Sequence, residues 1–527
     1  MNGLLGDVAM AARFVRGLPP YLRRPIIRAD AEAVVGERLA ARARHFVALA
    51  KHAIYAQASS PYRALLLAMG CAEADLEELV RVHGVEATLA RLQRAGVFVT
   101  VDELKGRHPI RRGSTVIDVD ARSFKNPLAM PSLWSATGGS RGTPLPVPLD
   151  LACVRDRAVN MNLALAARGG AQWRTAVWSL RGLVPVLWYA AGPARTAAWF
   201  TQTDLAQHGV GSRFKWSARL LTWESRLAGR PVPTPAYAPL DDPTAVLAWL
   251  AERLARDETP HLWGTPSAIV RLCGAAPAYG VDITGTQCTI TGEPITAARL
   301  GVMQRAGVTA LPDYGSVESG GTVAYGCMAG ATPDDAHVFT DLNALIAVDH
   351  GPLPRGALLI SSLLSTSPYI LFNASLGDRA TLTERDCGCP MQAIGWRTHL
   401  SNIRSFEKLT AGGVTFEDGV VVAVLEQVLP ARFGGGPTDY QLLETVGENG
   451  HAALRLLVAP SVGDLDVGEV RDVFLDTLGS MGDIERDMAA QWRETGALAV
   501  SREPPRQTAA GKILHLVAAH GTDDAPC

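Results

Sequence analysis

A glycine-rich stretch in the first third of the chain reads Thr137-Gly138-Gly139-Ser140-Arg141-Gly142-Thr143-Pro144. Its three glycines leave backbone N–H groups free to point at an anion, and the hydroxyl groups of Thr137, Ser140 and Thr143 add further donors. The spacing of the glycines, with no Gly-Lys-Ser/Thr sequence, excludes a Walker A loop and a Rossmann fingerprint. The stretch predicts a loop that binds the phosphates of a nucleotide, and an ordinary surface turn is the alternative.

Two later stretches carry groups that suit the same chemistry. The first is Asp313-Tyr314-Gly315-Ser316-Val317-Glu318, which follows an apolar run and ends in a carboxylate able to hold Mg²⁺ beside phosphate oxygens. The second, Pro505-Arg506-Gln507-Thr508-Ala509-Ala510-Gly511-Lys512-Ile513, carries one of only six lysines in the sequence. Its ammonium group could neutralise charge that develops on phosphate. An ordinary strand exit and a solvated lysine are the alternatives.

The order of these three motifs resembles the adenylate-forming acyl- and aryl-CoA synthetases, most closely the phenylacetate-CoA ligases and their relatives. The resemblance spans about residues 131–516. It implies that ATP activates an organic carboxylic acid as acyl-AMP, with release of pyrophosphate, and that the acyl group then passes to CoA as a thioester. Transfer to the phosphopantetheine of a carrier protein, transfer to an amine, and nucleotide binding without turnover stay open.

The resemblance also assigns site residues. Those assigned to nucleotide binding are Thr137, Gly138, Gly139, Ser140, Gly142, Thr143, Gly292, Glu293, Pro294, Asp313, Tyr314, Gly315, Ser316, Asp378 and Arg397. Arg141 stands where Ser or Thr is more usual, and Val317 stands where a hydroxyl residue is expected before the glutamate. These two departures leave the details of the phosphate contacts open.

Four of the side chains receive individual roles from the resemblance. Tyr314 is expected to stack on the base, and Asp378 to accept hydrogen bonds from both ribose hydroxyls. Glu318 takes the Mg²⁺ position, and Lys512 bridges the substrate carboxylate and the α-phosphate. Lys512 and Glu318 are therefore the candidate catalytic residues, with ATP and Mg²⁺ as the implied cofactors. No side-chain nucleophile is required, because positioning and charge neutralisation suffice for attack on phosphorus.

The chain is predicted to fold as an α/β protein with two domains. Residues 1–396 form the large ATP- and acid-binding domain, and residues 1–125 of it are a mostly helical opening section with three-to-four apolar spacing. Residues 397–527 form a small, mobile α+β domain, and the resemblance implies a hinge within residues 397–413. The apolar runs Leu183–Tyr189 and Val420–Leu425 predict strands.

Four scattered residues form a candidate zinc site. Cys387-Gly388-Cys389-Pro390 holds two thiols, and Cys327 and His337 lie ten residues apart in the segment after Glu318. A Cys₃His set suits a tetrahedral structural zinc ion, although a gap of two residues between paired cysteines is commoner than one. Buried reduced thiols and a surface histidine are the alternative.

The composition limits the partners. The 527 residues are 47% hydrophobic and carry a net charge of −2, which predicts a large folded protein without the basic surplus that nucleic-acid binding needs. No apolar run reaches the roughly 18 residues of a membrane span, and the first twenty residues lack a secretory signal pattern. We therefore expect a cytoplasmic protein, and the resemblance implies an enzyme with a small-molecule acid as substrate. The resemblance adds CoA or a carrier protein as acceptor and suggests a homodimer.

Overall fold

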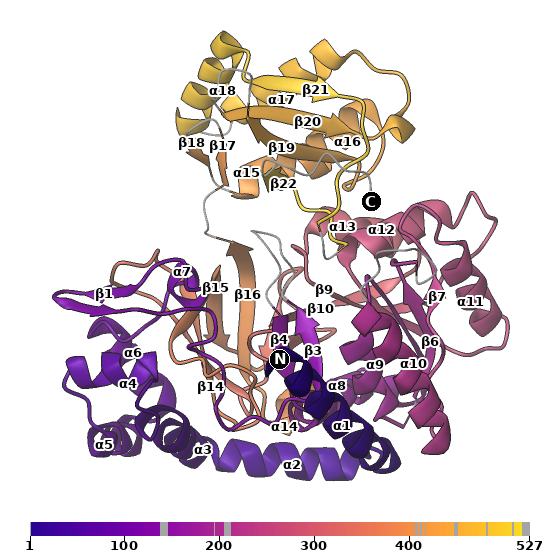
Figure 1. Ribbon diagram of the computed structural model, residues 1–527. Helices are drawn as coiled ribbons and strands as arrows, with labels where there is room; N and C mark the ends of the chain where they lie inside the picture. Colours follow the sequence, from indigo (N-terminus) through magenta and orange to yellow (C-terminus); the bar gives the residue numbers. More distant parts are fainter. Residues whose placement is uncertain are drawn as a thin grey trace.

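The structure is a computed structural model that describes residues 2–136, 146–193, 195–204, 212–405, 409–411, 414–416, 418–446, 452–480, 483–508 and 511–518. Figure 1 shows a large body below and a smaller body above it. We call residues 2–405 the large unit and residues 409–518 the small unit. Among the described helices, none combines the length and the apolar character needed to cross a membrane.

The large unit is built on one sheet, in which twelve strands are described. Their order is β13 (Asn343–Ala347), β14 (Ala357–Ser362), β15 (Ala374–Glu384), β16 (Thr398–Ser405), β12 (Ala336–Val338), β11 (Gly321–Gly326), β10 (Thr309–Ser316), β9 (Gln287–Thr291), β8 (Pro260–Gly264), β5 (Arg174–Ser179), β6 (Thr196–Thr201) and β7 (Ala236–Tyr237). From β13 to β10 neighbouring strands are antiparallel, and from β10 to β7 they are parallel. The parallel strands therefore end at one common edge.

Helices connect and cover the sheet. They are α8 (Leu151–Ala167), η2 (Gly170–Gln172), α9 (Leu183–Ala190), α10 (Ser212–Leu227), α11 (Thr244–Leu254), α12 (Pro266–Ala275), α13 (Ala297–Arg305) and α14 (Pro390–Ile394). Helix α9 links β5 to β6, α12 links β8 to β9, and α13 links β9 to β10, as parallel strands require crossover connections. A short hairpin of β3 (Leu133–Ala136) and β4 (Pro146–Leu149) precedes them.

The opening section is helical, as predicted. Its elements are α1 (Asn2–Arg23), α2 (Arg28–Ala40), α3 (Arg42–Leu49), η1 (Ala50–Tyr55), α4 (Pro61–Ala68), α5 (Glu73–His83), α6 (Val85–Arg94), α7 (Val101–Leu104) and the hairpin β1 (Ile110–Arg112) and β2 (Thr115–Ile117). In Figure 1 these indigo and purple helices run along the base and one side of the large unit. Phe46 of α3 stacks on Phe372 at 5.4 Å between ring centroids, so the section shares the core of the large unit.

The small unit has α+β architecture. Its elements are β17 (Leu409–Ala411), β18 (Val414–Phe416), α15 (Asp418–Ala423), the π-helix η3 (Val424–Val428), α16 (Leu429–Phe433), β19 (Tyr440–Val446), β20 (Ala452–Val458), η4 (Pro460–Val462), α17 (Val467–Ser480), α18 (Asp483–Thr495), β21 (Leu498–Ser501) and β22 (Leu516–Ala518). The described strands of its main sheet lie in the order β21-β20-β19-β22. The large α/β unit and this small α+β unit confirm the predicted fold class.

Two predicted strands are helices. The run Leu183–Tyr189 forms α9, and Val420–Leu425 lies in α15 and η3. In α9, Leu183 and residues 185–190 are all buried, and in η3 both Val424 and Leu425 are fully buried. An element with little exposed surface has no polar face, so its sequence shows neither the helical nor the strand period.

The strand β16 lies entirely within the predicted small domain, just after the predicted domain boundary. It begins at Thr398, pairs with both β15 and β12, and so belongs to the sheet of the large unit through Ser405. Since Thr398–Ser405 pack in the large unit, we propose that the boundary between the two domains lies after Ser405 and not at residue 397.

Candidate functional site

The candidate nucleotide site lies where two neighbouring parallel strands end. Thr291 at the end of β9 pairs in register with Asp313 in β10, so Gly292 lies beside Tyr314. Gly315 follows at an irregularity in the pairing with β11. A Cβ atom added at Gly315 would lie 2.3 Å from the carbonyl oxygen of Gly321, so the two backbones approach as closely as only glycine permits.

Tyr314 and Asp378 meet across the sheet. The Tyr314 hydroxyl donates a hydrogen bond of 2.9 Å to Asp378 Oδ2, from β10 to β15. Burial, the charge of Asp378, this hydrogen bond and the charge of Glu318 raise the pKa of Tyr314 well above its ordinary value, so the phenol stays protonated and acts as a donor. The structure thus joins two residues that are 64 positions apart in the sequence and were predicted to hold the base and the ribose.

Asp313 points into the protein. Its side chain is buried, and Oδ2 accepts a hydrogen bond of 3.2 Å from the indole N–H of Trp263 in β8. Burial raises the pKa of Asp313 to about 7, against the opposing effects of the nearby Thr322 hydroxyl and of the hydrogen bond from Trp263. The contact of Thr322 with Asp313 lies outside normal hydrogen-bond geometry. As a result, Asp313 Oδ1 and the Thr322 hydroxyl both have no hydrogen-bond partner among the described residues.

Glu318 lies in the turn between β10 and β11, where its side chain is half-buried. Its charge acts on two phenols: with Asp378 it raises the pKa of Tyr314, and it adds to burial in raising the pKa of Tyr369 to about 12. In the same turn, the Ser316 hydroxyl accepts a hydrogen bond of 3.0 Å from the backbone N–H of Ser319. A single carboxylate suits Mg²⁺, which keeps waters and substrate phosphates as its remaining ligands.

The Lys512 loop reaches this edge from the small unit. Gln441 of β19 holds both ends of the loop: its amide nitrogen donates to the carbonyl oxygens of Arg506 at 3.0 Å and Leu514 at 2.7 Å. Within the loop, the N–H of Thr508 donates to the carbonyl oxygen of Lys512 at 2.9 Å. A Cβ atom added at Gly292 would lie 3.1 Å from Lys512 Cε and 3.2 Å from Nζ, so the lysine lies against Gly292.

The Glu293 side chain is buried, and its carboxylate accepts hydrogen bonds from other groups of the protein. Ser267 donates to both of its oxygens, through its hydroxyl at 2.6 Å and its N–H at 2.9 Å. Arg299 Nη1 donates to Oε2 at 2.7 Å, and the N–H of Ile513 donates to Oε1 at 3.0 Å. The carboxylate is thus fully hydrogen-bonded beside Lys512, and Pro294 next to it is half-buried.

Arg397 does not join the cluster. It is exposed and lies just before β16, whereas Asp378 pairs with Ser405 at the other end of that strand. At about 3.3 Å per residue, an eight-residue strand separates the two by more than 20 Å. Arg404 is the arginine that the register brings beside this end of β15, where its guanidinium donates to Asp334 Oδ2 at 3.2 Å. No periodicity in the sequence indicates this strand register.

Six of the predicted residues, Thr137, Gly138, Gly139, Ser140, Gly142 and Thr143, lie outside the described residues. Their flanks are described: β3 ends at Ala136 and β4 begins at Pro146, and the two strands pair as a hairpin. The predicted phosphate loop is therefore the connection of that hairpin, and its role stays a prediction.

The four predicted zinc ligands come together. One ligand atom from each of Cys327, His337, Cys387 and Cys389 lies within 4.8 Å of the others. His337 Nε2 is 3.2 Å from Cys389 Sγ and 3.5 Å from Cys387 Sγ. The residues come from the end of β11, from β12 and from the loop after β15, so a bound ion would tie three parts of the sheet together.

The surroundings of His337 prepare its ring to bind a metal. Its Nδ1 is 2.6 Å from the carbonyl oxygen of Trp396, which can only accept a hydrogen bond. The ring proton therefore sits on Nδ1, and Nε2 presents its lone pair to the thiols. Burial and the neighbouring His399 lower the pKa of His337 to about 4, which keeps the imidazole neutral. The donor set and the tautomer both fit a structural zinc ion.

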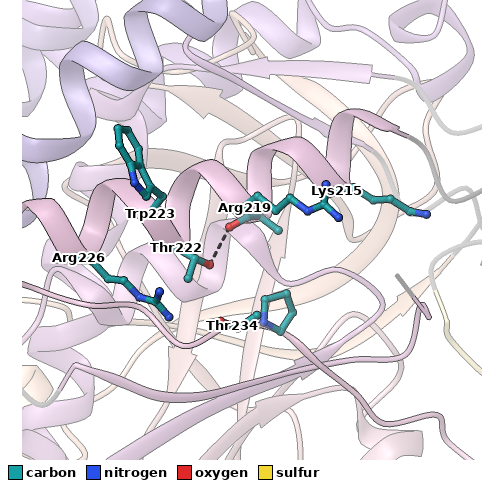
Figure 2. Close-up of a pocket in the computed structure, with 8 residues that line it drawn as sticks. Lys215, Arg219, Thr222, Trp223, Arg226 and Thr234 are labelled. Carbon is teal, nitrogen blue, oxygen red and sulfur yellow. Dashed lines mark hydrogen bonds between the residues drawn. The ribbon is translucent and has the colours of Figure 1, made fainter. Parts of the chain in front are cut away.

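A pocket of about 280 Å³ lies elsewhere, along α10. Figure 2 shows that Lys215, Arg219, Thr222, Trp223 and Arg226 extend from this helix around it, with Thr234 opposite. None of the predicted site residues lines this pocket. It therefore plays no part in the candidate site.

Comparisons with known proteins found no matching family model and no matching curated protein. Among solved structures, a 2-hydroxyisobutyryl-CoA ligase in complex with 2-HIB-AMP and CoA is 15% identical, covers 94% of this chain and 91% of its own, and has a TM-score of 0.46. An anthranilate CoA ligase in complex with anthranoyl-AMP is 12% identical over 72% of this chain and 65% of its own, with a TM-score of 0.45. The O-succinylbenzoate CoA synthetase from Bacillus subtilis, in complex with ATP and magnesium, is 12% identical over 74% and 70%, with a TM-score of 0.42.

These neighbours are acyl- and aryl-CoA ligases. The phenylacetate-CoA ligase-like subtype seen in the sequence stays a prediction. Because each TM-score lies below 0.5, we base the function on the side chains of this chain.

Proposed function

We propose that this protein activates an organic carboxylic acid with ATP and transfers the acyl group to a thiol, with CoA as the acceptor. The observation that carries the proposal is the meeting of Lys512 with Gly292, beside the Tyr314–Asp378 pair. Three motifs that are far apart in the sequence, around residues 292, 314 and 512, are thus assembled at one edge of the sheet. An ammonium group against a positive-φ glycine at the ends of parallel strands suits an anionic substrate.

The residues account for the first half-reaction. A carboxylate oxygen of the acid attacks the α-phosphorus of ATP, the bond from that phosphorus to the bridging oxygen breaks, and pyrophosphate leaves. Lys512 would neutralise charge between the carboxylate and the α-phosphate. Tyr314 and Asp378 would hold the base and ribose, and Glu318 would hold Mg²⁺, which supplies charge neutralisation on the phosphates.

The second half-reaction needs an acceptor but no protein nucleophile. The thiol sulfur attacks the acyl carbon of the mixed anhydride, the bond from that carbon to the phosphate oxygen breaks, AMP leaves, and the thiol proton passes to solvent. CoA and the phosphopantetheine of a carrier protein present the same thiol. We propose CoA as the acceptor, with a carrier protein or an amine as the alternatives, and the predicted homodimer remains a prediction.

We also propose that Cys327, His337, Cys387 and Cys389 bind a structural zinc ion. The convergence of three thiols on the lone-pair side of His337 Nε2 supports this proposal. The site lies at the far end of β16 from Asp378, which suits a structural role and not a catalytic one.

The experiment that tests the function is acid-dependent release of pyrophosphate from MgATP, measured over a panel of aryl, aliphatic and amino acids. Lys512→Ala should lose about 4–6 kcal/mol of transition-state stabilisation, a rate loss of three or more powers of ten. Lys51→Ala is the matched control, because Lys51 pairs with Glu73 on the surface of the opening section. Nucleotide binding with no pyrophosphate release for any acid would instead support a non-catalytic nucleotide-binding protein.

A further inference from the structure

A buried arginine connects the two units next to the Lys512 loop. Arg299 of α13 is 1% exposed, and its guanidinium contacts four groups, one of which is His515 Nε2 at 3.4 Å from Nη2. Nη1 donates to Glu293 Oε2 at 2.7 Å, Nε donates to Glu426 Oε1 at 2.6 Å, and Nη2 donates to the carbonyl oxygen of Ile513 at 3.3 Å. One side chain of the large unit thus holds both η3 and the C-terminal segment of the small unit.

Glu426 completes the connection from the small unit. It lies on η3 and is 3% exposed. His515 Nε2 is 2.7 Å from Oε1, and the hydroxyl of Thr296, the N-cap residue of α13, donates to Oε2. Hydrogen bonding to His515 and the charge of Arg299 outweigh burial and hold the pKa of Glu426 at about 2, so the carboxylate is ionised.

Ile513 fixes the main chain next to Lys512. Its N–H donates to Glu293, and its carbonyl oxygen accepts from Arg299. Its side chain is 1% exposed and packs in a hydrophobic cluster. The other buried members of this cluster lie between Ala176 and Val308, in the parallel half of the large sheet and its connecting segments. The residue after Lys512, which belongs to the small unit, is therefore held by residues of the large unit through its N–H, its carbonyl oxygen and its side chain.

We propose that Arg299, Glu293 and Glu426 form an ionic latch that positions Lys512 for the adenylation step. This inference rests on the proposed function. None of the three side chains needs to touch substrate, so they are positioning residues. The latch determines where the backbone of residue 513 lies, and thereby where the ammonium group of residue 512 can reach. Opening the latch would free the small unit together with Lys512.

The test uses Glu426→Gln, which keeps the size of the side chain and removes its charge. We expect the rate of acid-dependent pyrophosphate release to fall about ten-fold or more, with the KM for ATP changed less than about two-fold. Thioester formation from a supplied acyl-adenylate should change less than about two-fold, because it does not use the Lys512 charge. In a Lys512→Ala background, Glu426→Gln should have almost no further effect, because both act through the same ammonium group.

Two further variants serve as a control and as a substitute for Glu426→Gln. Glu103→Gln is the matched control, because Glu103 is also a buried carboxylate paired with an arginine, Arg112, but lies in the opening section. Glu103→Gln should not change the rate of one half-reaction more than the rate of the other. If Glu426→Gln does not fold, His515→Gln weakens the same carboxylate's contacts more mildly.

Hydrogen exchange distinguishes failure of the latch from failure of the proposed function. Backbone amides of residues 511–515 should exchange faster in Glu426→Gln than in the wild type, with no ligand needed. Equal exchange, or equal losses in both half-reactions, would overturn the latch. If the wild-type protein released no pyrophosphate for any acid, the proposed function would fail, and the exchange rates alone would still decide whether the latch holds residue 513.

Discussion

At the residue scale, the Tyr314–Asp378 hydrogen bond is the contact whose loss should change the affinity for a nucleotide most directly. Tyr314→Phe keeps the ring for stacking and removes the donor that orients Asp378. A hydrogen bond to a charged group contributes about 1.5–3 kcal/mol, so we expect the Kd for ATP to rise by about ten-fold to one hundred-fold. Isothermal calorimetry of ATP binding measures it, with the exposed Tyr279→Phe as control. An unchanged Kd would place the ribose elsewhere.

Asp313 gives a second residue-scale prediction, on stability. Its folded-state pKa of about 7 exceeds the ordinary 3.8, so between these pH values the folded protein binds more protons than the unfolded chain. Asp313 therefore costs increasing stability as the pH rises from about 4 to about 7, at about 1.4 kcal/mol per unit at most, and the cost is constant above that. Asp313→Asn should stabilise the protein more at pH 8 than at pH 5.

Thermal unfolding at the two pH values measures this difference. Asp349→Asn, at an exposed carboxylate, controls for the substitution itself. A stability gain for Asp313→Asn that was the same at both pH values would show that Asp313 titrates normally.

Single residues also show where sequence reasoning reached its limit. Tyr314, Asp378, Gly292 and Lys512 carry recognisable local motifs, and the structure brings them to one edge. Arg299 has no motif, because its partners Glu293, Glu426 and Ile513 lie 6, 127 and 214 positions away. Such a cluster is determined by the packing of two units, and a single sequence does not display it.

At the element scale, the zinc site depends on the loop between β15 and α14 reaching β12. We expect about one equivalent of zinc in the purified protein, and its loss in Cys387→Ser with Cys389→Ser. Losing the ion should lower the Tm by about 4 °C or more, because the loop would no longer be tied to the sheet. Cys71→Ser, at a buried cysteine of the opening section, should keep the zinc. Less than about a tenth of an equivalent in the wild type would contradict the site.

Elements differ in how well their sequences display them. The amphipathic helices of the opening section were predicted from their spacing, because each keeps a solvated face, as α6 does with the exposed Arg91 and Arg94 opposite the buried Leu89 and Leu92. The runs in α9 and η3 are apolar on nearly every side, and their helical state is decided by the surrounding layers. The distance of Arg397 from Asp378 could not be derived from the sequence for the same reason, since the register of β16 depends on β15 and β12.

At the scale of the whole molecule, the arrangement of hydrophobic cores determines how the protein should unfold. The core of the small unit is separate and extends from Val421 to Leu498, whereas the opening section and the antiparallel half of the large sheet share one cluster. The latch and Ile513 are the described contacts that pass between the cores beside Lys512. Two units with separate cores, joined by a narrow set of contacts, should unfold in more than one step.

Scanning calorimetry of paired core variants tests this expectation. Phe474→Leu, in the small core, and Phe372→Leu, in the large core, each remove ring contacts from a fully buried side chain at a cost of about 1–2 kcal/mol. Each variant should lower only the transition of its own unit, and the smaller unit should show the larger shift, because its unfolding entropy is smaller. A single transition that both variants lower equally would mean that the latch couples the two cores into one cooperative body. In that case Glu426→Gln should split the transition, since it removes the charge that holds η3 to Arg299.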